Sequence, residues 1–289
     1  MVKLNKKLFK TFFKITLTVT ALYFVFSKVD IKDIESILKK VDLLYLFLAF
    51  IFFNLSKILS SIRLNIYFKH IGVKISEIYA LKLYYIGMFY NLFLPSGVGG
   101  DGYKIYILNK SHNIKLSTLI TASLLDRVSG LIPLLFFASS LFIFSQFYHK
   151  FIWLDWFGLI GAVTIFPLFY LINRLFFKGY LKIFFKTTLL GTLVQLLQLL
   201  SALFIVYAIG YESSTIIFLT LFLISSVMAV LPISVGGVGV RELTFLYGLT
   251  LIGLDASGGV AFSMLFFLIT AISSFIGVFF NINSYPKDF

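Results

Sequence analysis

Pro95-Ser-Gly-Val-Gly-Gly-Asp-Gly-Tyr-Lys104 interrupts an otherwise apolar chain, and a similar stretch, Pro232-Ile-Ser-Val-Gly-Gly-Val-Gly-Val-Arg241, interrupts it again. Aligned without a gap, the two decapeptides share the proline, one valine and three glycines, and both end on a cation. Glycine permits positive φ and proline lacks an amide hydrogen, so each stretch is expected to break a helix. A duplicated break of this kind predicts a membrane protein built from two repeats.

The composition is that of an integral membrane protein. Hydrophobic residues make up 60% of the chain and charged residues 13%, and the mean hydropathy is +0.99. Runs such as Leu116–Phe144 and Thr188–Ile209 approach or exceed the roughly 20 apolar residues that cross a hydrocarbon core. Because these runs are continuous rather than alternating, we expect α-helices and not a β-barrel.

The distribution of lysine and arginine predicts the orientation. Most of the 25 Lys and Arg residues lie in loops that the positive-inside rule assigns to the inner side, together with a basic N-terminal arm. We therefore expect a multi-pass protein of the cell (inner) membrane with both termini in the cytoplasm. The apolar run Phe9–Phe26 is followed by no small-residue cleavage site, so it is interpreted as a retained helix. Orientation and anionic headgroups account for the net charge of +13, so no nucleic-acid partner is expected.

The resulting architecture is all-α, with six crossings and two re-entrant helical hairpins. Crossings are predicted near residues 9–26, 43–67, 116–144, 151–172, 188–209 and 257–281. The hairpins contain the two decapeptides, and the charged segment 28–42 is expected to form an external amphipathic helix. The chain is thus predicted to be a single integral membrane domain, 1–289, whose inverted repeats, about 1–145 and 146–289, meet near the midplane. Eight ordinary spanning helices are the alternative.

Both decapeptides are candidate anion sites. Amides exposed at a helix break, together with the positive end of the helix that follows, bind phosphate or carboxylate well. The alternative is that the glycines only allow helices to cross closely. Arg241 and Glu242 follow the second break as Lys104 follows the first, so we expect cations beside both amide clusters.

Asp126-Arg127 is the second polar feature. The pair begins about ten residues after Leu116, so it lies about 15 Å along that helix and close to the bilayer centre. Adjacent side chains point in different directions on a helix, so each is expected to pair with another helix. The candidate partners are Asp101 or Glu242 for Arg127, and Lys104, Arg241 or Lys57 for Asp126. A structural ion pair and a headgroup or proton site are both open interpretations. Lys57 itself is expected to snorkel toward the inner headgroups.

No catalytic constellation is evident, so the protein is not expected to be an enzyme and no metal or cofactor is predicted. The three histidines lie in loops, cysteine is absent, and the buried serines have no nearby histidine base. The residues expected to bind substrate are Asn91, Ser96, Gly99, Gly100, Asp101, Lys104, Asp126, Arg127, Ser234, Gly236, Gly237, Arg241 and Glu242. Among the cations we expect the strongest phosphate contact from Arg127 or Arg241.

Three motifs resemble the flippase-like, lysylphosphatidylglycerol synthase transmembrane-region family. They are Asn91-Leu-Phe-Leu-Pro-Ser-Gly-Val-Gly-Gly-Asp101 with Lys104, Asp126-Arg127 followed by Gly130-Leu131, and Pro232-Ile-Ser-Val-Gly-Gly-Val-Gly-Val-Arg-Glu242. The resemblance extends over essentially the whole chain. It implies an inner-membrane protein that binds lipids and moves them between leaflets, without the soluble aminoacyl-transferase domain to which some members are fused.

The expected function is lipid translocation. A phosphate headgroup, from an anionic phospholipid or a polyprenyl-linked lipid, would bind in a polar cavity between the repeats while its tails stay in the bilayer. No nucleotide-hydrolysing motif is present, so movement is expected to be downhill or driven by an ion gradient. A secondary transporter of a small anionic solute and a membrane-embedded lipid-modifying transferase are the alternatives. A homo-oligomer and a separate lipid-modifying enzyme are further partners that the sequence permits.

Overall fold

The computed structural model describes residues 16, 19–20, 22–93, 99–112, 114–145, 147, 152–230 and 237–280. Throughout these ranges the regular secondary structure is helical, with no strand. The predicted all-α class is therefore confirmed.

Six helical segments within the described ranges are long and apolar enough to cross a membrane. They are Leu43–His70, Leu116–Phe144, Gly158–Phe176, Lys178–Ala208, Glu212–Val230 and Ser257–Phe279. Five of the predicted crossings coincide with five of these segments, and the predicted crossing at 9–26 lies largely outside the described residues. Glu212–Val230 differs from expectation, because it was predicted as one limb of a hairpin and yet has the length of a span. The chain is a multi-pass membrane protein.

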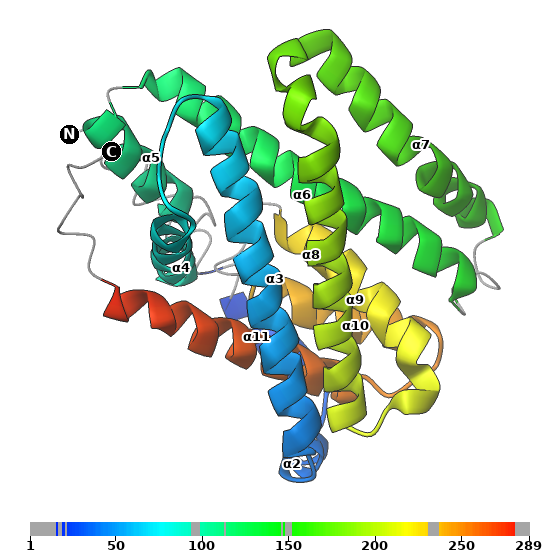
Figure 1. Ribbon diagram of the computed structural model, residues 1–289. Helices are drawn as coiled ribbons and strands as arrows, with labels where there is room; N and C mark the ends of the chain where they lie inside the picture. Colours follow the sequence, from blue (N-terminus) through cyan, green and yellow to red (C-terminus); the bar gives the residue numbers. More distant parts are fainter. Residues whose placement is uncertain are drawn as a thin grey trace.

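Helices α3 (Leu43–His70) and α8 (Leu181–Ala208) run side by side through the centre of the molecule (Figure 1). The hydroxyl of Ser201 on α8 donates to the carbonyl of Ala49 on α3 at 2.8 Å. Helix α6 (Leu116–Phe144), predicted with these same bounds, packs on both, and α7 (Ile152–Phe176) lies along α6. These four helices form the frame that positions the polar residues described below.

Glycine allows α8 to approach α6 closely. Pro133 has no amide hydrogen, so the carbonyl of Ser129 lacks its usual helical donor. A Cβ added at Gly191 of α8 would lie 2.5 Å from that carbonyl oxygen, well inside van der Waals contact. The two helices can therefore touch here only because residue 191 has no side chain.

Two pairs of shorter helices contain the Gly-rich stretches. Helix α4 (Glu77–Phe93) packs against α5 (Gly99–His112), and α9 (Thr215–Val230) packs against α10 (Val240–Leu251). Leu83 of α4 and Leu108 of α5 share one apolar cluster with Phe68 near the end of α3. Phe218 of α9 and Leu249 of α10 belong to another cluster. In each pair the two helices thus pack against each other.

The two pairs start from opposite ends of the molecule. The first pair begins where α3 ends. The second follows the end of α8, and there the amide of Asp42, just before α3, donates to the carbonyl of Ala208 at 2.9 Å. Helix α11 (Ser257–Phe275) then crosses beneath α3 in the view of Figure 1 and packs on α4.

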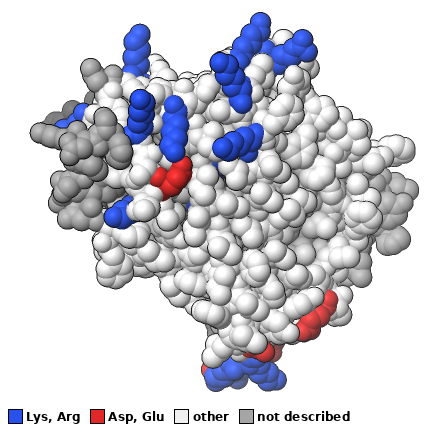
Figure 2. Space-filling model, in the orientation of Figure 1, with Lys and Arg blue, Asp and Glu red and all other residues white. Residues whose placement is uncertain are grey.

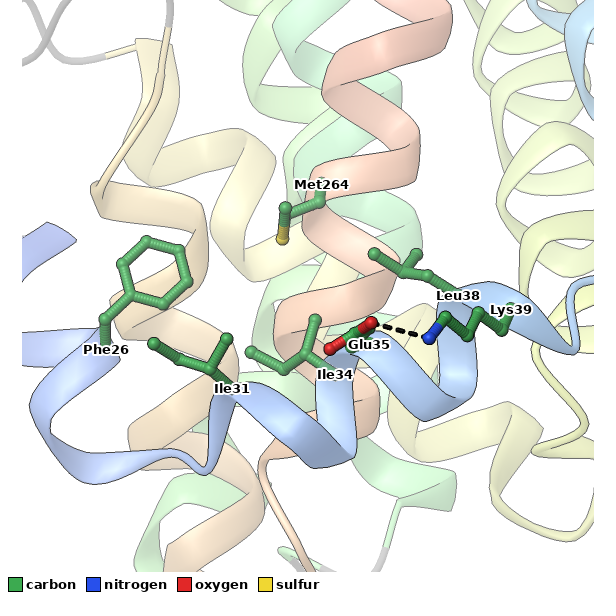
Figure 3. A pocket seen from close by; sticks show the side chains of 7 residues that line it. All are labelled: Phe26, Ile31, Ile34, Glu35, Leu38, Lys39 and Met264. Atoms are coloured by element: carbon green, nitrogen blue, oxygen red, sulfur yellow. Dashed lines mark ion pairs between the residues drawn. The ribbon is translucent and has the colours of Figure 1, made fainter.

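The predicted amphipathic helix within residues 28–42 is α2 (Ile31–Lys39). The Asp30 side chain caps it by accepting the amide of Lys32 at 2.8 Å, and Ile34 is buried. A shallow groove runs between α2 and α11 (Figure 3). It is lined by Phe26, Ile31, Ile34, Glu35, Leu38, Lys39 and Met264. Its two charged residues, Glu35 and Lys39, pair with each other at 2.6 Å, so the groove has an apolar floor and no free charge for a headgroup.

Charged side chains gather at two opposite ends of the molecule, and a broad band between them carries almost none on the face shown in Figure 2. The exposed cations at the end where α3, α5 and α7 finish are Lys69, Lys74, Lys82, Lys110, Lys115, Arg174, Lys178, Lys182 and Lys186. His70, at the end of α3, contacts the turn before α8, because its Nε2 lies 2.8 Å from the carbonyl oxygen of Gly179. The opposite end carries α2. The uncharged band has the character expected of a surface in contact with lipid.

Candidate headgroup-binding site

Asp101 holds two of the predicted cations. Its Oδ1 lies 2.6 Å from Nζ of Lys104, one turn further along α5, and its Oδ2 accepts from Nε of Arg127 on α6. The Lys104 and Asp101 side chains are buried, whereas 37% of the Arg127 side chain is exposed. The Lys104 ammonium also lies 5.0 Å from the ring centre of Tyr84 on α4. One acid therefore neutralises part of the charge of two cations, and Arg127 is the more accessible of the two.

Asp126 pairs with a residue that the sequence did not single out. Nε of Arg63, on α3, donates to its Oδ1 at 2.8 Å, and both side chains are almost fully buried. Lys104, Arg241 and Lys57 were the predicted partners of Asp126, and that prediction was wrong. Arg63 lies within α3 and within the predicted crossing 43–67, close to the end of the helix that carries the inner cations.

The guanidinium of Arg63 occupies a slot lined by glycine. A Cβ at Gly130 of α6 would lie 3.0 Å from both of its terminal nitrogens, and one at Gly191 of α8 would lie 3.3 Å from Nη1. Nη1 has no hydrogen-bond partner among the described residues. The Arg63–Asp126 pair thus joins α3 to α6, and α8 closes over it.

The neighbours Asp126 and Arg127 do not pair with each other. Asp126 turns toward α3 and Arg127 toward α5, as expected for adjacent residues on a helix. Asp101 was one of the two acids predicted for Arg127, and the structure selects it. The other, Glu242, has a different role.

Glu242 caps the helix that follows the second break. Its Oε2 accepts the amide of Gly239 at 2.6 Å, and the side chain is buried. Gly237 and Gly239 have φ of 82° and 84°, a region that favours glycine. The predicted break is therefore present at the start of α10, and Glu242 is used by the backbone there.

Arg241 points in a different direction from Glu242. Its Nη1 donates to the hydroxyl of Ser226 on α9 at 3.2 Å, and its guanidinium lies 4.8 Å from the ring centre of Phe266 on α11. The cation after the second break is therefore fixed to α9 and α11, while the corresponding Lys104 is fixed within the first pair.

The first Gly-rich stretch is described only from Gly99 onward. The side-chain oxygen of Asn91, which was expected to bind substrate, accepts the amide of Gly100 at 2.8 Å, so Asn91 satisfies backbone at the start of α5. Gly99 and Gly100 form the first residues of that helix. Ser96, Ser234 and Gly236 lie outside the described residues.

Lys57 does not reach the inner end of α3. It lies about halfway along this 28-residue helix. Its ammonium is 4.2 Å from the ring centre of Phe53, one turn toward the opposite end. Lys57 therefore belongs to the polar residues of the interior and not to the inner surface where we expected it to snorkel.

No cluster of three or more histidine or acidic residues that could hold a metal ion occurs in the described part of the chain. The chemistry that the site offers is cationic: guanidinium and ammonium groups, each partly satisfied by an acid, a hydroxyl or an aromatic ring. Such groups bind phosphate through charge-assisted hydrogen bonds.

Comparison with known proteins agrees with the motifs. The family described as the lysylphosphatidylglycerol synthase TM region matches residues 11–187 and 181–277. A UPF0104 membrane protein of Pyrococcus horikoshii is 22% identical over 158 residues, which are 54% of this chain and 47% of that protein. The chain thus spans about half the length of this curated relative. Because the family match covers nearly all of the described helices, the resemblance seen in the three motifs is confirmed, and the chain belongs to the lysylphosphatidylglycerol synthase TM region family.

Proposed function

We propose that this protein is a lipid translocase that binds a phosphate-bearing headgroup within the membrane and moves it between leaflets. The observation that carries the proposal is an excess of positive charge among the core helices. The cations are Lys57, Arg63, Lys104, Arg127 and Arg241, and the acids are Asp101, Asp126 and Glu242. Uncompensated charge is costly in hydrocarbon, so ionisable residues at this depth usually face a partner or a transport path. An anionic headgroup would offset the excess.

A headgroup would first bind at Arg127, where it would compete with Asp101 for the guanidinium. Its side chain is more exposed than those of Asp101 and Lys104, and its guanidinium can bind phosphate through two parallel hydrogen bonds. A phosphate that displaces Asp101 from Arg127 leaves Asp101 with Lys104 alone. The Gly100 and Gly239 amides are already bonded to Asn91 and Glu242, so other amides at the starts of α5 and α10 would be the added donors.

In this proposal the pairs α4–α5 and α9–α10 are re-entrant hairpins of two inverted repeats, about 1–145 and 146–289. Support comes from the packing of α4 on α5 and of α9 on α10, and from the start of the two pairs at opposite ends of α3. The cation-rich end lies in the cytoplasm, with both termini, in the cell (inner) membrane. Opposed hairpins would let one site be reached from either leaflet.

The chain acts as a transporter and not as an enzyme in this proposal. Movement is downhill or coupled to an ion gradient, with Asp101, Asp126 or Glu242 as proton carriers. A separate lipid-modifying enzyme would supply the lipid if the transported headgroup is a modified one, and assembly into a homo-oligomer is compatible with the proposal.

Replacing Arg127 with alanine tests the site. In proteoliposomes containing a fluorescent phospholipid, a membrane-impermeant quencher reaches inner-leaflet label only after the lipid has moved to the outer leaflet. Arg127→Ala should slow this quenching by at least about tenfold, because one charge-assisted contact is lost. Lys82→Ala, which removes an exposed cation from α4, is the matched control and should transport like wild type. Equal rates for Arg127→Ala and wild type would place the headgroup elsewhere.

Single cysteines test the orientation. Asn109→Cys on α5 and Lys178→Cys in the short turn before α8 are both exposed and should react with an impermeant thiol reagent only from the cytoplasmic side. Ser36→Cys on α2 should react only from the outside. Labelling of Asn109→Cys from outside would make α4 and α5 parts of a full crossing instead of a hairpin.

A further inference from the structure

Lys57 and Arg241 are joined through a pair of aromatic rings. The Lys57 ammonium lies 4.2 Å from the ring centre of Phe53, and the Arg241 guanidinium lies 4.8 Å from that of Phe266. The two rings meet edge to face, with their centres 5.7 Å apart. Both phenylalanines are almost fully buried. The two rings thus link the two cations across one contact between α3 and α11.

These two cations lack the acid that each of the others has. Arg63 pairs with Asp126, and Lys104 and Arg127 share Asp101. The described residues provide no ion pair for Lys57 or for Arg241, and the neighbouring Glu242 is bonded to the amide of Gly239. Ring faces attract cations but do not neutralise them. No acid among the described residues therefore pairs with Lys57 or Arg241.

The side chains of Lys57 and Arg241 are both partly exposed. Lys57 and Arg241 are half-buried, in contrast to Arg63 and Lys104, which are buried. Lys57 lies 14 residues after the start of α3, about 21 Å along a helix of about 42 Å, which is the middle of the span. Arg241 reaches the same neighbourhood from the start of α10, because it packs on Phe266, whose ring contacts Phe53 next to Lys57. Two partly exposed cations near the bilayer centre are a candidate site for an anion.

We propose that Lys57 and Arg241 together bind a dianionic phosphate group, the phosphomonoester or diphosphate headgroup of a lipid, at the middle of the translocation path. This inference rests on the proposed function and assigns its substrate class. A headgroup with two negative charges matches both cations, whereas a phosphodiester with one leaves a charge uncompensated in an apolar region. Arg127 then serves as the earlier contact, where the phosphate competes with Asp101.

Binding in detergent solution tests the assignment. Full-length protein is titrated with dihexanoyl phosphatidic acid, dihexanoyl phosphatidylglycerol and inorganic phosphate, well above the second phosphate pKa of about 6. We expect phosphatidic acid to bind at least about tenfold more tightly than either of the others. Equal affinity for the two lipids overturns the dianion preference. Inorganic phosphate that binds as tightly as phosphatidic acid shows a site for a soluble anion and overturns the lipid assignment.

Lys57→Met separates a binding role from a structural one. Without ligand, this variant should melt above wild type because it relieves the repulsion between Lys57 and Arg241, and it should lose at least about tenfold in affinity for phosphatidic acid. Lys57→Arg should retain binding, and Lys82→Met should match wild type in both measurements. A Lys57→Met protein that binds phosphatidic acid as tightly as wild type overturns the proposal. A variant whose weak binding goes with the loss of its monodisperse fold also overturns it, because Lys57 then has a structural role.

Transport distinguishes this inference from the proposed function on which it rests. If proteoliposomes move phosphatidylglycerol and phosphatidic acid equally fast, the protein is a translocase and the dianion site is wrong. If phosphatidic acid binds through Lys57 and Arg241 but neither lipid moves, the site is correct and the translocase proposal fails.

Discussion

Replacing Asp126 with asparagine is expected to lower the free energy of unfolding by about 3–5 kcal/mol, which is the usual effect of removing one partner from a buried ion pair. Arg63 would lose the carboxylate that lies 2.8 Å from its Nε, and its side chain is only 6% exposed. Its Nη1 already has no hydrogen-bond partner among the described residues. The variant therefore leaves a charged guanidinium in the interior with too few acceptors.

Thermal unfolding in detergent measures this effect. Glu77→Gln is the matched control, since it removes an ion pair of 2.6 Å to Lys69 that is about half exposed and contributes about 1 kcal/mol or less. Combining Arg63→Met with Asp126→Leu should restore most of the stability, because an apolar pair needs no compensating charge. If the Asp126→Asn protein melts no lower than Glu77→Gln, the Arg63–Asp126 ion pair does not contribute the expected stability.

Gly100→Ala is expected to force α4 and α5 apart. A Cβ at residue 100 would overlap the backbone carbonyl of Gly87 and lie 2.7 Å from its Cα, where carbon atoms need about 3.5–4.0 Å. Both sides of the contact are helix backbone, so no side chain can move aside. Separation would also break the bond between Asn91 and the Gly100 amide and displace Lys104, which packs against Gly87.

Gly102 provides the control for that substitution. A Cβ there meets nothing within 4 Å, so Gly102→Ala should stabilise α5 by up to about 1 kcal/mol, through helix propensity alone. Gly100→Ala should instead lose about 1–3 kcal/mol or more, as in overpacked cores, together with most transport activity. Melting temperature and transport rate measured on both variants check this. Similar melting temperatures for the two would mean that α4 and α5 do not touch at Gly87.

Features of the fold that depend on local composition were predictable. Helix α6 has the predicted bounds because its apolar run is bordered by Lys115 and by polar residues after Phe144. Helix α2 was predicted because charges and apolar residues alternate with helical period over a short segment. In contrast, α8 begins at Leu181 and not at Thr188, because Lys182 and Lys186 project outward from its first turns and do not end it.

The pairing of charges was predictable only in part. Arg127 and Asp101 could be matched because each follows a recognisable motif, but two acids were equally compatible with Arg127. The partner of Asp126 depends on which face of α3 meets α6, which is decided by the close approach at Gly130 and Gly191 and leaves no periodic signal in the sequence. Arg63 and Lys57 both lie inside the apolar run of α3, so their contacts depend on how that helix packs and not on its composition.

The extent of quenching in proteoliposomes tests translocation most directly. Vesicles with a fluorescent phospholipid in both leaflets are treated with a membrane-impermeant quencher, with and without the wild-type protein and with matched leak controls. The proposal predicts that the protein raises the quenched share from the outer-leaflet label to nearly all of the label. If intact vesicles with and without the protein are quenched to the same extent and at the same rate, the protein does not move phospholipid between leaflets.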